Sequence, residues 1–114
     1  MRKDPRAAAM PERELQEAVR RLCANLGLHH FHVLNSKGCE PGWPDSTIIG
    51  RKVIFRELKS ETGRVSDEQR EVGQRLQRAG QNWRIWRPSD LLSGQIAKEL
   101  TELADTAQLF ETAS

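Results

Sequence analysis

Residues 42–59 read GWPDSTIIGRKVIFRELK, and most of the expected architecture follows from this segment. Two runs rich in β-branched and aromatic residues, 45–49 and 52–59, flank the dipeptide Gly50-Arg51. Short apolar runs on either side of a two-residue turn are typical of an antiparallel β-hairpin. The prolines and glycines between residues 38 and 44 predict a loop before the first of these strands.

The segments around the hairpin alternate between helical and extended patterns. Apolar residues recur at helical spacing between residues 11 and 26, and Gly27 marks the end of that helix. Ser66 and Gln69 form a capping-box pattern at the start of a second helix. The remaining expectations are a strand over 29–35, the second helix over 66–79, a strand over 83–87, and a last helix that Ser89 caps and that carries Leu91, Leu92, Ile96, Leu100 and Leu103. This order predicts an α/β domain with a mixed sheet flanked by helices.

The hairpin brings three charged side chains to one end of the sheet. Asp45 begins one strand and Glu57 lies near the end of the next, so the two carboxylates are expected side by side. Because strand side chains alternate between faces, Lys59 points the same way as Glu57, and Leu58 points to the opposite face. Two neighbouring carboxylates repel each other, and a cation relieves that repulsion. An all-oxygen ligand set favours Mg²⁺ or Mn²⁺. This chemistry suits phosphodiester hydrolysis, with Lys59 beside the attacking water or the charged phosphorane.

The same residues carry a resemblance to a known family. The pattern Gly42-x-Pro44-Asp45 followed by Glu57-x-Lys59 resembles the PD-(D/E)XK nuclease superfamily, specifically its small stand-alone VRR-NUC nucleases. The likeness covers roughly residues 11–92 and continues through Gly63-Arg64-Val65-Ser66, Gln69, Leu76, Gly80 and Trp86-Arg87-Pro88-Ser89-Asp90. It implies a restriction-endonuclease-like α-β-β-β-α-β core, here followed by a C-terminal helix. It also implies that Asp45, Glu57 and the Leu58 carbonyl bind metal and that Lys59 is catalytic.

The family also has a metal-supporting glutamate on the first helix, and three glutamates compete for this role. At about 100° per residue, Glu12 lies within about 20° of Val19 and shares the inward apolar stripe. Glu14 lies about 100° from Leu15, and Glu17 lies about 160° away. A glutamate on a buried stripe is costly unless it is paired or faces a cation. We therefore expect Glu12 at the metal, with Glu14 as the alternative. The simpler explanation of Glu12 is that the helix dipole stabilises a glutamate in the first turn.

Four further residues are candidates for nucleic-acid contact. Ser36 and Lys37 precede the Pro-Asp motif, and Arg64 lies in the loop before the second helix. Each of these three is equally well explained as a solvated loop residue. In the family the matching glutamine reaches the active site, so Gln69 is either a site residue or a helix cap. We expect that one side chain does not easily do both.

The histidines and tryptophans are expected to be structural. His29, His30 and His32 suggest zinc, but acidic or cysteine partners at ligand spacing are absent from the sequence. His30 and His32 share one strand face, where they line the cleft or, as we favour, make ordinary hydrogen bonds. Tryptophans are more often core or interface residues than base-stacking platforms, which applies to Trp43, Trp83 and Trp86.

A chain of 114 residues suits a single domain. We expect a flexible tail over 1–10, the nuclease domain over 11–92, and a C-terminal helix and tail over 93–114. No apolar run approaches the roughly 20 residues of a membrane span, and the charged N-terminus leads into no signal-peptide core. Cys23 and Cys39 are expected to be free thiols in the reducing cytoplasm of a bacterial or phage-infected cell.

The net charge of +2 hides an asymmetry along the chain. Residues 98–114 hold one basic and four acidic side chains, so residues 1–97 hold 17 basic and 12 acidic side chains, a net charge of +5. Thirteen of the 18 basic residues are arginine, which forms forked phosphate contacts. The composition is therefore compatible with a DNA partner and predicts binding that weakens with salt.

Together these patterns predict a Mg²⁺- or Mn²⁺-dependent DNA endonuclease that leaves a 5′-phosphate and a 3′-hydroxyl, as the family resemblance implies. Small stand-alone members resemble Holliday junction resolvases and commonly act as homodimers, so branched DNA is the expected substrate. The alternatives are a non-specific DNA nickase of the same fold, a catalytically silent nucleic-acid-binding member, and a protein that docks a partner through its acidic C-terminal helix. Neither a membrane partner nor a nucleotide cofactor is expected.

Overall fold

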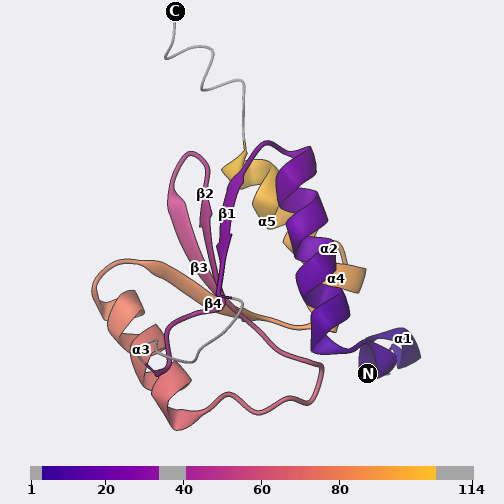
Figure 1. Cartoon of the computed structure of the whole chain (residues 1–114), viewed down its shortest axis with the longest axis horizontal. Coiled ribbons are helices and arrows are strands. Elements are labelled where there is room, and N and C mark those ends of the chain that lie inside the picture. Colours follow the sequence, from indigo (N-terminus) through magenta and orange to yellow (C-terminus); the bar gives the residue numbers. More distant parts are fainter. Residues whose placement is uncertain (1–3, 34–40, 105–114) are drawn as a thin grey trace, which may run out of the picture.

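The computed structural model describes residues 4–33 and 41–104, and within them a four-stranded sheet is flanked by helices (Figure 1). In chain order the elements are α1 (Pro5–Ala9), α2 (Glu12–Asn25), β1 (His29–His32), β2 (Ser46–Ile49), β3 (Val53–Leu58), α3 (Asp67–Arg78), β4 (Asn82–Trp86), α4 (Pro88–Leu92) and α5 (Gln95–Leu103). The strands lie in the order β1-β2-β3-β4. The first two pairings are antiparallel, and β3 pairs with β4 in parallel through the crossover helix α3. The predicted α/β class with a mixed sheet is therefore confirmed.

The central hairpin forms where the sequence predicts it. Ile48 pairs with Ile54 and Ile49 pairs with Val53, so the turn spans residues 50–52. The Arg51 N–H donates to the Leu103 carbonyl at 3.0 Å, which ties the turn to the end of α5. A Cβ atom on Gly50 would collide with the Leu103 backbone, which explains the glycine at this close approach.

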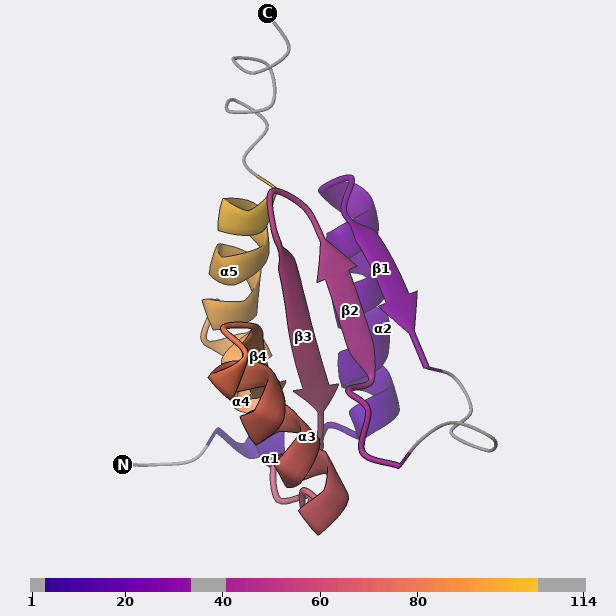
Figure 2. The same cartoon turned by 90° about the vertical axis from the view of Figure 1, so that its left-hand side faces the viewer.

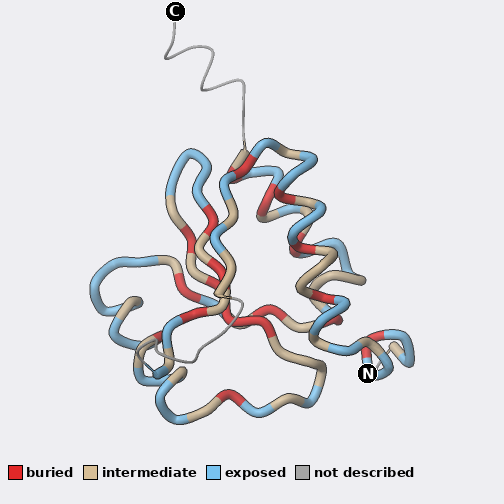
Figure 3. The backbone as a smooth tube through the Cα atoms, viewed as in Figure 1, coloured by how far each residue is buried: buried red, intermediate tan, exposed pale blue. Residues whose placement is uncertain are grey.

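The hydrophobic core lies between one face of the sheet and the helices α2 and α5. Figure 3 shows buried residues on the strands and along α2. The cluster consists of Leu15, Val19, Cys23, Leu28, Ile48, Ile54, Leu58, Trp86, Ile96, Leu100 and Leu103. The apolar stripe of α5 therefore packs on its own domain, and the core extends past residue 92, the expected end of the nuclease domain. Cys23 is a buried free thiol whose pKa is raised by burial to about 11, whereas Cys39 lies outside the described residues.

Helix α3 lies on the opposite face of the sheet, against β4. The ring of Trp83 occupies the space where a side chain on Gly73 would be, so the glycine allows the helix to approach the strand closely. Figure 2 shows α3 in front of the sheet and α2 behind it. Within the described residues, we found no helix with the length and hydropathy needed to span a membrane.

Two expectations about the ends of the chain differ from the structure. Residues 5–9, expected within a flexible tail, form the helix α1, which Asp4 caps and in which Ala7 is buried. The single last helix is instead two helices, α4 and α5, and Arg87 is at the N-cap of α4, so Ser89 lies within the helix and does not cap it. Gly94 separates the two helices because it adopts a φ of +86°, which a continuous α-helix does not allow. Short-range helical spacing alone does not reveal this break.

Candidate active site

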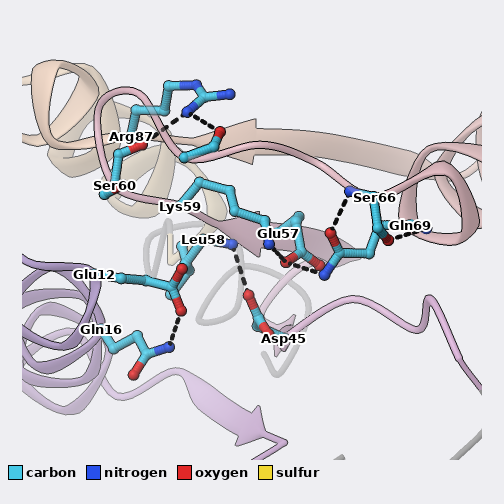
Figure 4. Close-up of polar contacts among 11 residues, drawn as sticks. Glu12, Gln16, Asp45, Glu57, Leu58, Lys59, Ser60, Ser66, Gln69 and Arg87 are labelled. Atoms are coloured by element: carbon cyan, nitrogen blue, oxygen red, sulfur yellow. Dashed lines mark hydrogen bonds and ion pairs between the residues drawn. The ribbon is translucent and has the colours of Figure 1, made fainter.

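Asp45 and Glu57 lie at neighbouring strand ends, as the hairpin geometry predicts. Ser46 pairs with Arg56, which places the residue before β2 beside the penultimate residue of β3. The backbone N–H of Leu58 donates to Asp45 Oδ2 at 2.9 Å (Figure 4). This contact fixes the Asp45 carboxylate at the end of β3.

Lys59 completes the predicted group. Its Nζ atom lies 3.6 Å from Glu57 Oε2, and its backbone N–H donates to the Trp86 carbonyl at 3.1 Å. Leu58, between the two charged residues, points into the core and is fully buried. The alternation of strand faces therefore places Glu57 and Lys59 on one side of the strand end and Leu58 on the other.

Glu57 is an unusual carboxylate because only 1% of it is exposed. Burial, reinforced by hydrogen bonding and charge repulsion from Asp45, raises the pKa of Glu57 to about 8, while Lys59 acts in the opposite direction. Its Oε1 atom is buried and has no hydrogen-bond partner in the described part of the chain. A buried carboxylate oxygen without a partner is costly, and it indicates a place for a proton or a cation.

Gln69 both caps the helix α3 and contacts a residue of the candidate site, two roles that we did not expect in one side chain. Its Oε1 atom accepts from the Ser66 backbone N–H at 2.9 Å, and its backbone N–H donates to Ser66 Oγ at 3.1 Å, which forms the capping box. Its Nε2 atom donates to Glu57 Oε2 at 2.9 Å. The prediction of one role or the other was wrong because an amide has an acceptor end and a donor end, which can serve different partners.

Glu12 is the glutamate of α2 that lies nearest this group. It is half-buried, accepts from Gln16 Nε2 at 3.1 Å, and lines a hollow of about 550 Å³ together with Asp45 and Glu57. Burial, then the Asp45 charge, raises the pKa of Glu12, and Lys59 opposes this. Glu14 is exposed on another side of the helix.

The alternative glutamates line a different cavity. Glu14 and Glu17 border a hollow of about 740 Å³ between α2 and β1, and Glu17 forms ion pairs with Arg20 and Arg21. The geometry therefore favours Glu12 as the glutamate that faces Asp45 and Glu57, in agreement with the helical-wheel reasoning.

The hollow also contains His32, for which lining the cleft was the less favoured expectation, Trp43, which was expected in the core or an interface, and Glu68, which the sequence did not single out. His32 Nδ1 is buried without a partner among the described residues, while His30 Nε2 lies 2.8 Å from Ser46 Oγ. The sequence signal for the position of His32 was strand alternation, which places His30 and His32 on one face.

The other candidate contact residues lie elsewhere. Arg64 is exposed, lies 3.6 Å from Asp67 Oδ1, and is not among the described residues that line the hollow. Ser36 and Lys37 fall outside the described residues. Of the tryptophans, Trp83 and Trp86 are buried, as expected for core residues, but Trp43 is exposed.

Arg87 secures the loop that follows Lys59. Its Nη1 atom donates to the carbonyls of Ser60, Glu61 and Gly63 at 2.7, 3.2 and 2.8 Å. Figure 4 shows Arg87 beside Ser60. Carbonyl groups of an irregular loop need such donors when water is excluded. Arg87 therefore holds the chain between β3 and α3, which carry Glu57 and Gln69.

The donor chemistry of the hollow fits a hard divalent cation. Carboxylates are the ligands that Mg²⁺ and Mn²⁺ prefer, and Glu57 offers a free buried oxygen. Among residues 4–33 and 41–104, however, no three acidic, histidine or cysteine side chains are already arranged as a metal-binding group. The Asp45, Glu57 and Glu12 carboxylates instead accept hydrogen bonds from Leu58, Gln69 and Gln16.

Comparisons of this chain with protein-family models, with curated proteins and with solved structures found no match. A functional assignment therefore depends on the residues of the site.

Proposed function

We propose that the chain is a divalent-metal-dependent DNA endonuclease with a restriction-endonuclease-like core, of the VRR-NUC type within the PD-(D/E)XK nucleases. The observation that carries this proposal is the meeting of Asp45, Glu57 and Lys59 at adjacent strand ends. The order of elements from α2 to β4, α-β-β-β-α-β, supports it. The half-buried Glu12 beside the same hollow adds a fourth residue of the expected kind.

The residues of the site divide the chemistry among them. Asp45, Glu57 and Glu12, with the Leu58 carbonyl, would hold Mg²⁺ or Mn²⁺. When bound, the cation would supply Lewis acidity and neutralise charge on the phosphoryl oxygens. Gln69 holds the Glu57 carboxylate in place through its Nε2 atom.

Lys59 is the remaining functional group beside the carboxylates. Its ammonium lies 3.6 Å from Glu57, close enough to position a water molecule or to offset charge on the pentavalent phosphorus. Water attack on the phosphodiester would then release a 3′-hydroxyl and leave a 5′-phosphate.

We further propose that the substrate is branched DNA and that the protein acts as a homodimer in the cytoplasm of a bacterial or phage-infected cell. The resemblance to small stand-alone nucleases supports this proposal. Two active sites related by a two-fold axis would suit the cutting of two strands at a junction. A non-specific nickase of the same fold is distinguished from this enzyme by its substrate range.

The test is cleavage of labelled four-way junction, flap, nicked, linear duplex and single-stranded DNA with Mg²⁺ or Mn²⁺ and with chelator. Asp45→Asn and Lys59→Met should each abolish cleavage while far-ultraviolet circular dichroism stays unchanged. The matched controls are Asp67→Asn and Lys52→Met, which alter an exposed aspartate and an exposed lysine outside the hollow. Cleavage that persists in chelator, or in both site variants, would refute the proposal.

Glu12 is tested against Glu14 by the metal dependence of the reaction. Glu12→Gln should raise the Mg²⁺ concentration needed for half-maximal cleavage, and Glu14→Gln should leave it unchanged. The reverse result would assign the supporting role to Glu14.

A further inference from the structure

Trp43 differs from the other two tryptophans in its exposure and its place. Its exposed fraction is 47%, against 8% for Trp83 and 1% for Trp86. Trp43 also lines the same hollow as Asp45 and Lys59. A large aromatic ring is thus left half in water at the mouth of the candidate active site, where burial does not explain it.

The Trp43 ring is held by its surroundings. It packs edge-on against Phe55 of β3, with ring centroids 6.0 Å apart. The preceding residue, Gly42, has a φ of +92°, and a Cβ atom there would collide with the Glu68 carbonyl of α3. The loop is therefore pressed against the start of α3, and a rigidly held ring loses little conformational freedom when it binds a flat partner.

Two further aromatic side chains, Phe55 and Phe31, lie on the outer face of the sheet with Thr47 between them, and together with Trp43 we call them the aromatic row. Phe55 pairs with Thr47, and Thr47 pairs with Phe31 on the edge strand β1. Paired residues point to the same face, and this is the face opposite the core. Phe31 has an exposed fraction of 58%. In Figure 2, β1 and β2 face the viewer with α2 behind them.

We propose that Trp43 stacks on an unpaired base of the DNA strand whose phosphate lies at the carboxylate site. This inference depends on the proposed function, because it places the DNA at the hollow of Asp45 and Glu57. An aromatic side chain reaches the face of a base only where that base has left the duplex stack. The site thereby selects DNA with unpaired bases, such as flaps and junction arms, over continuous duplex, without reading sequence.

The test measures, in the presence of Mg²⁺, binding of a labelled duplex with a single-stranded arm to the Lys59→Ala protein, in which cleavage is blocked and the carboxylates are intact. A second substrate carries abasic sites throughout the arm. Trp43→Ala should weaken binding of the base-bearing arm about ten- to a hundredfold and leave binding of the abasic arm unchanged. Trp43→Phe should restore most of the affinity, and Ile49→Ala, at the far end of the same face, should have no effect.

Each other outcome overturns the inference. Equal weakening of both arms would show that Trp43 shapes the loop and does not stack. A loss of dimer in sedimentation with no difference between the two arms would assign the aromatic row to contact with a second copy of the chain. If the Lys59→Ala protein binds the arm as expected but the wild-type protein cleaves no substrate, the proposed hydrolysis is wrong and the stacking of Trp43 stands. If no DNA binds to either protein, both proposals are wrong.

Discussion

Replacing Glu57 with glutamine should stabilise the metal-free protein at alkaline pH. The pKa of Glu57 is raised to about 8 by burial and by Asp45, from an ordinary value of 4.5. Between these two values the folded protein keeps a proton that the unfolded chain has lost. The free energy of unfolding therefore falls as the pH rises through this window. Glutamine has no ionisable proton at this position, so the Glu57→Gln protein should not show this loss of stability.

The size of the effect follows from the displacement of the pKa. Each unit of displacement corresponds to about 1.4 kcal/mol, so ionisation of the buried Glu57 opposes folding by a few kcal/mol, and by about 5 kcal/mol at most. The side chain is essentially inaccessible, so screening by solvent reduces this little. Glutamine also keeps the shape of the site, because its amide can accept from Gln69 and donate toward Asp45.

The measurement is urea denaturation of both proteins in chelator at several values between about pH 5 and about pH 9. The wild-type protein should lose stability across this range, and Glu57→Gln should lose much less. The control is Glu71→Gln, which removes an exposed carboxylate paired with Arg75 and should follow the wild type. Parallel curves for the wild type and Glu57→Gln would refute the account of the buried carboxyl group.

A divalent cation should change the pH dependence of stability in the wild-type protein but not in Glu57→Gln. If Mg²⁺ or Mn²⁺ takes the place of the proton, it should stabilise the wild-type protein more at high pH than at low pH, because ligand carboxylates must be deprotonated. The Glu57→Gln protein should gain little at either pH. A cation effect that is independent of pH in the wild type would show that Glu57 is not a ligand.

Three further predictions concern the scaffold of the site. Glu99→Ala leaves the buried Arg56 guanidinium without its carboxylate at 2.8 Å and should lower the free energy of unfolding by about 3–5 kcal/mol in denaturation experiments; replacing both by apolar residues should be far less harmful. Gly73→Ala should destabilise the protein by about 1–3 kcal/mol, because the new methyl group meets the Trp83 ring, although helix propensity alone favours alanine by about 1 kcal/mol. Arg87→Met removes the donor to three loop carbonyls, and hydrogen exchange of the amides in residues 60–63 should become faster than in Arg87→Lys.

The positions of Asp45, Glu57 and Lys59 could be predicted because they depend on local geometry. A hairpin with a short turn fixes which residues lie opposite each other, and alternation of faces fixes where the side chains point. The placement of Glu12 followed in the same way from the angular spacing of a helix. Each of these inferences uses only a repeat of 2.0 or 3.6 residues.

The features that sequence reasoning missed depend on contacts between distant segments. Arg56 shares the core-facing side of β3 with Leu58, and its charge is matched there because α5 brings Glu99 to it across more than forty positions in the chain. The second role of Gln69 needs the start of α3 to lie beside the end of β3. Helix α1 has a local signal in its cap, Asp4, but a helix of five residues is marginal without packing, and the burial of Ala7 depends on the tertiary fold.

The charges around the hollow set an order of events for the proposed reaction. Among the described residues that line it, Glu12, Asp45, Glu57 and Glu68 are acidic, and Lys59 is basic. A phosphodiester entering this group would be repelled while the carboxylates are ionised and uncompensated. A divalent cation cancels two of these charges and supplies an attraction for phosphate oxygens. Under the proposed function, the cation therefore has to enter before the DNA or together with it.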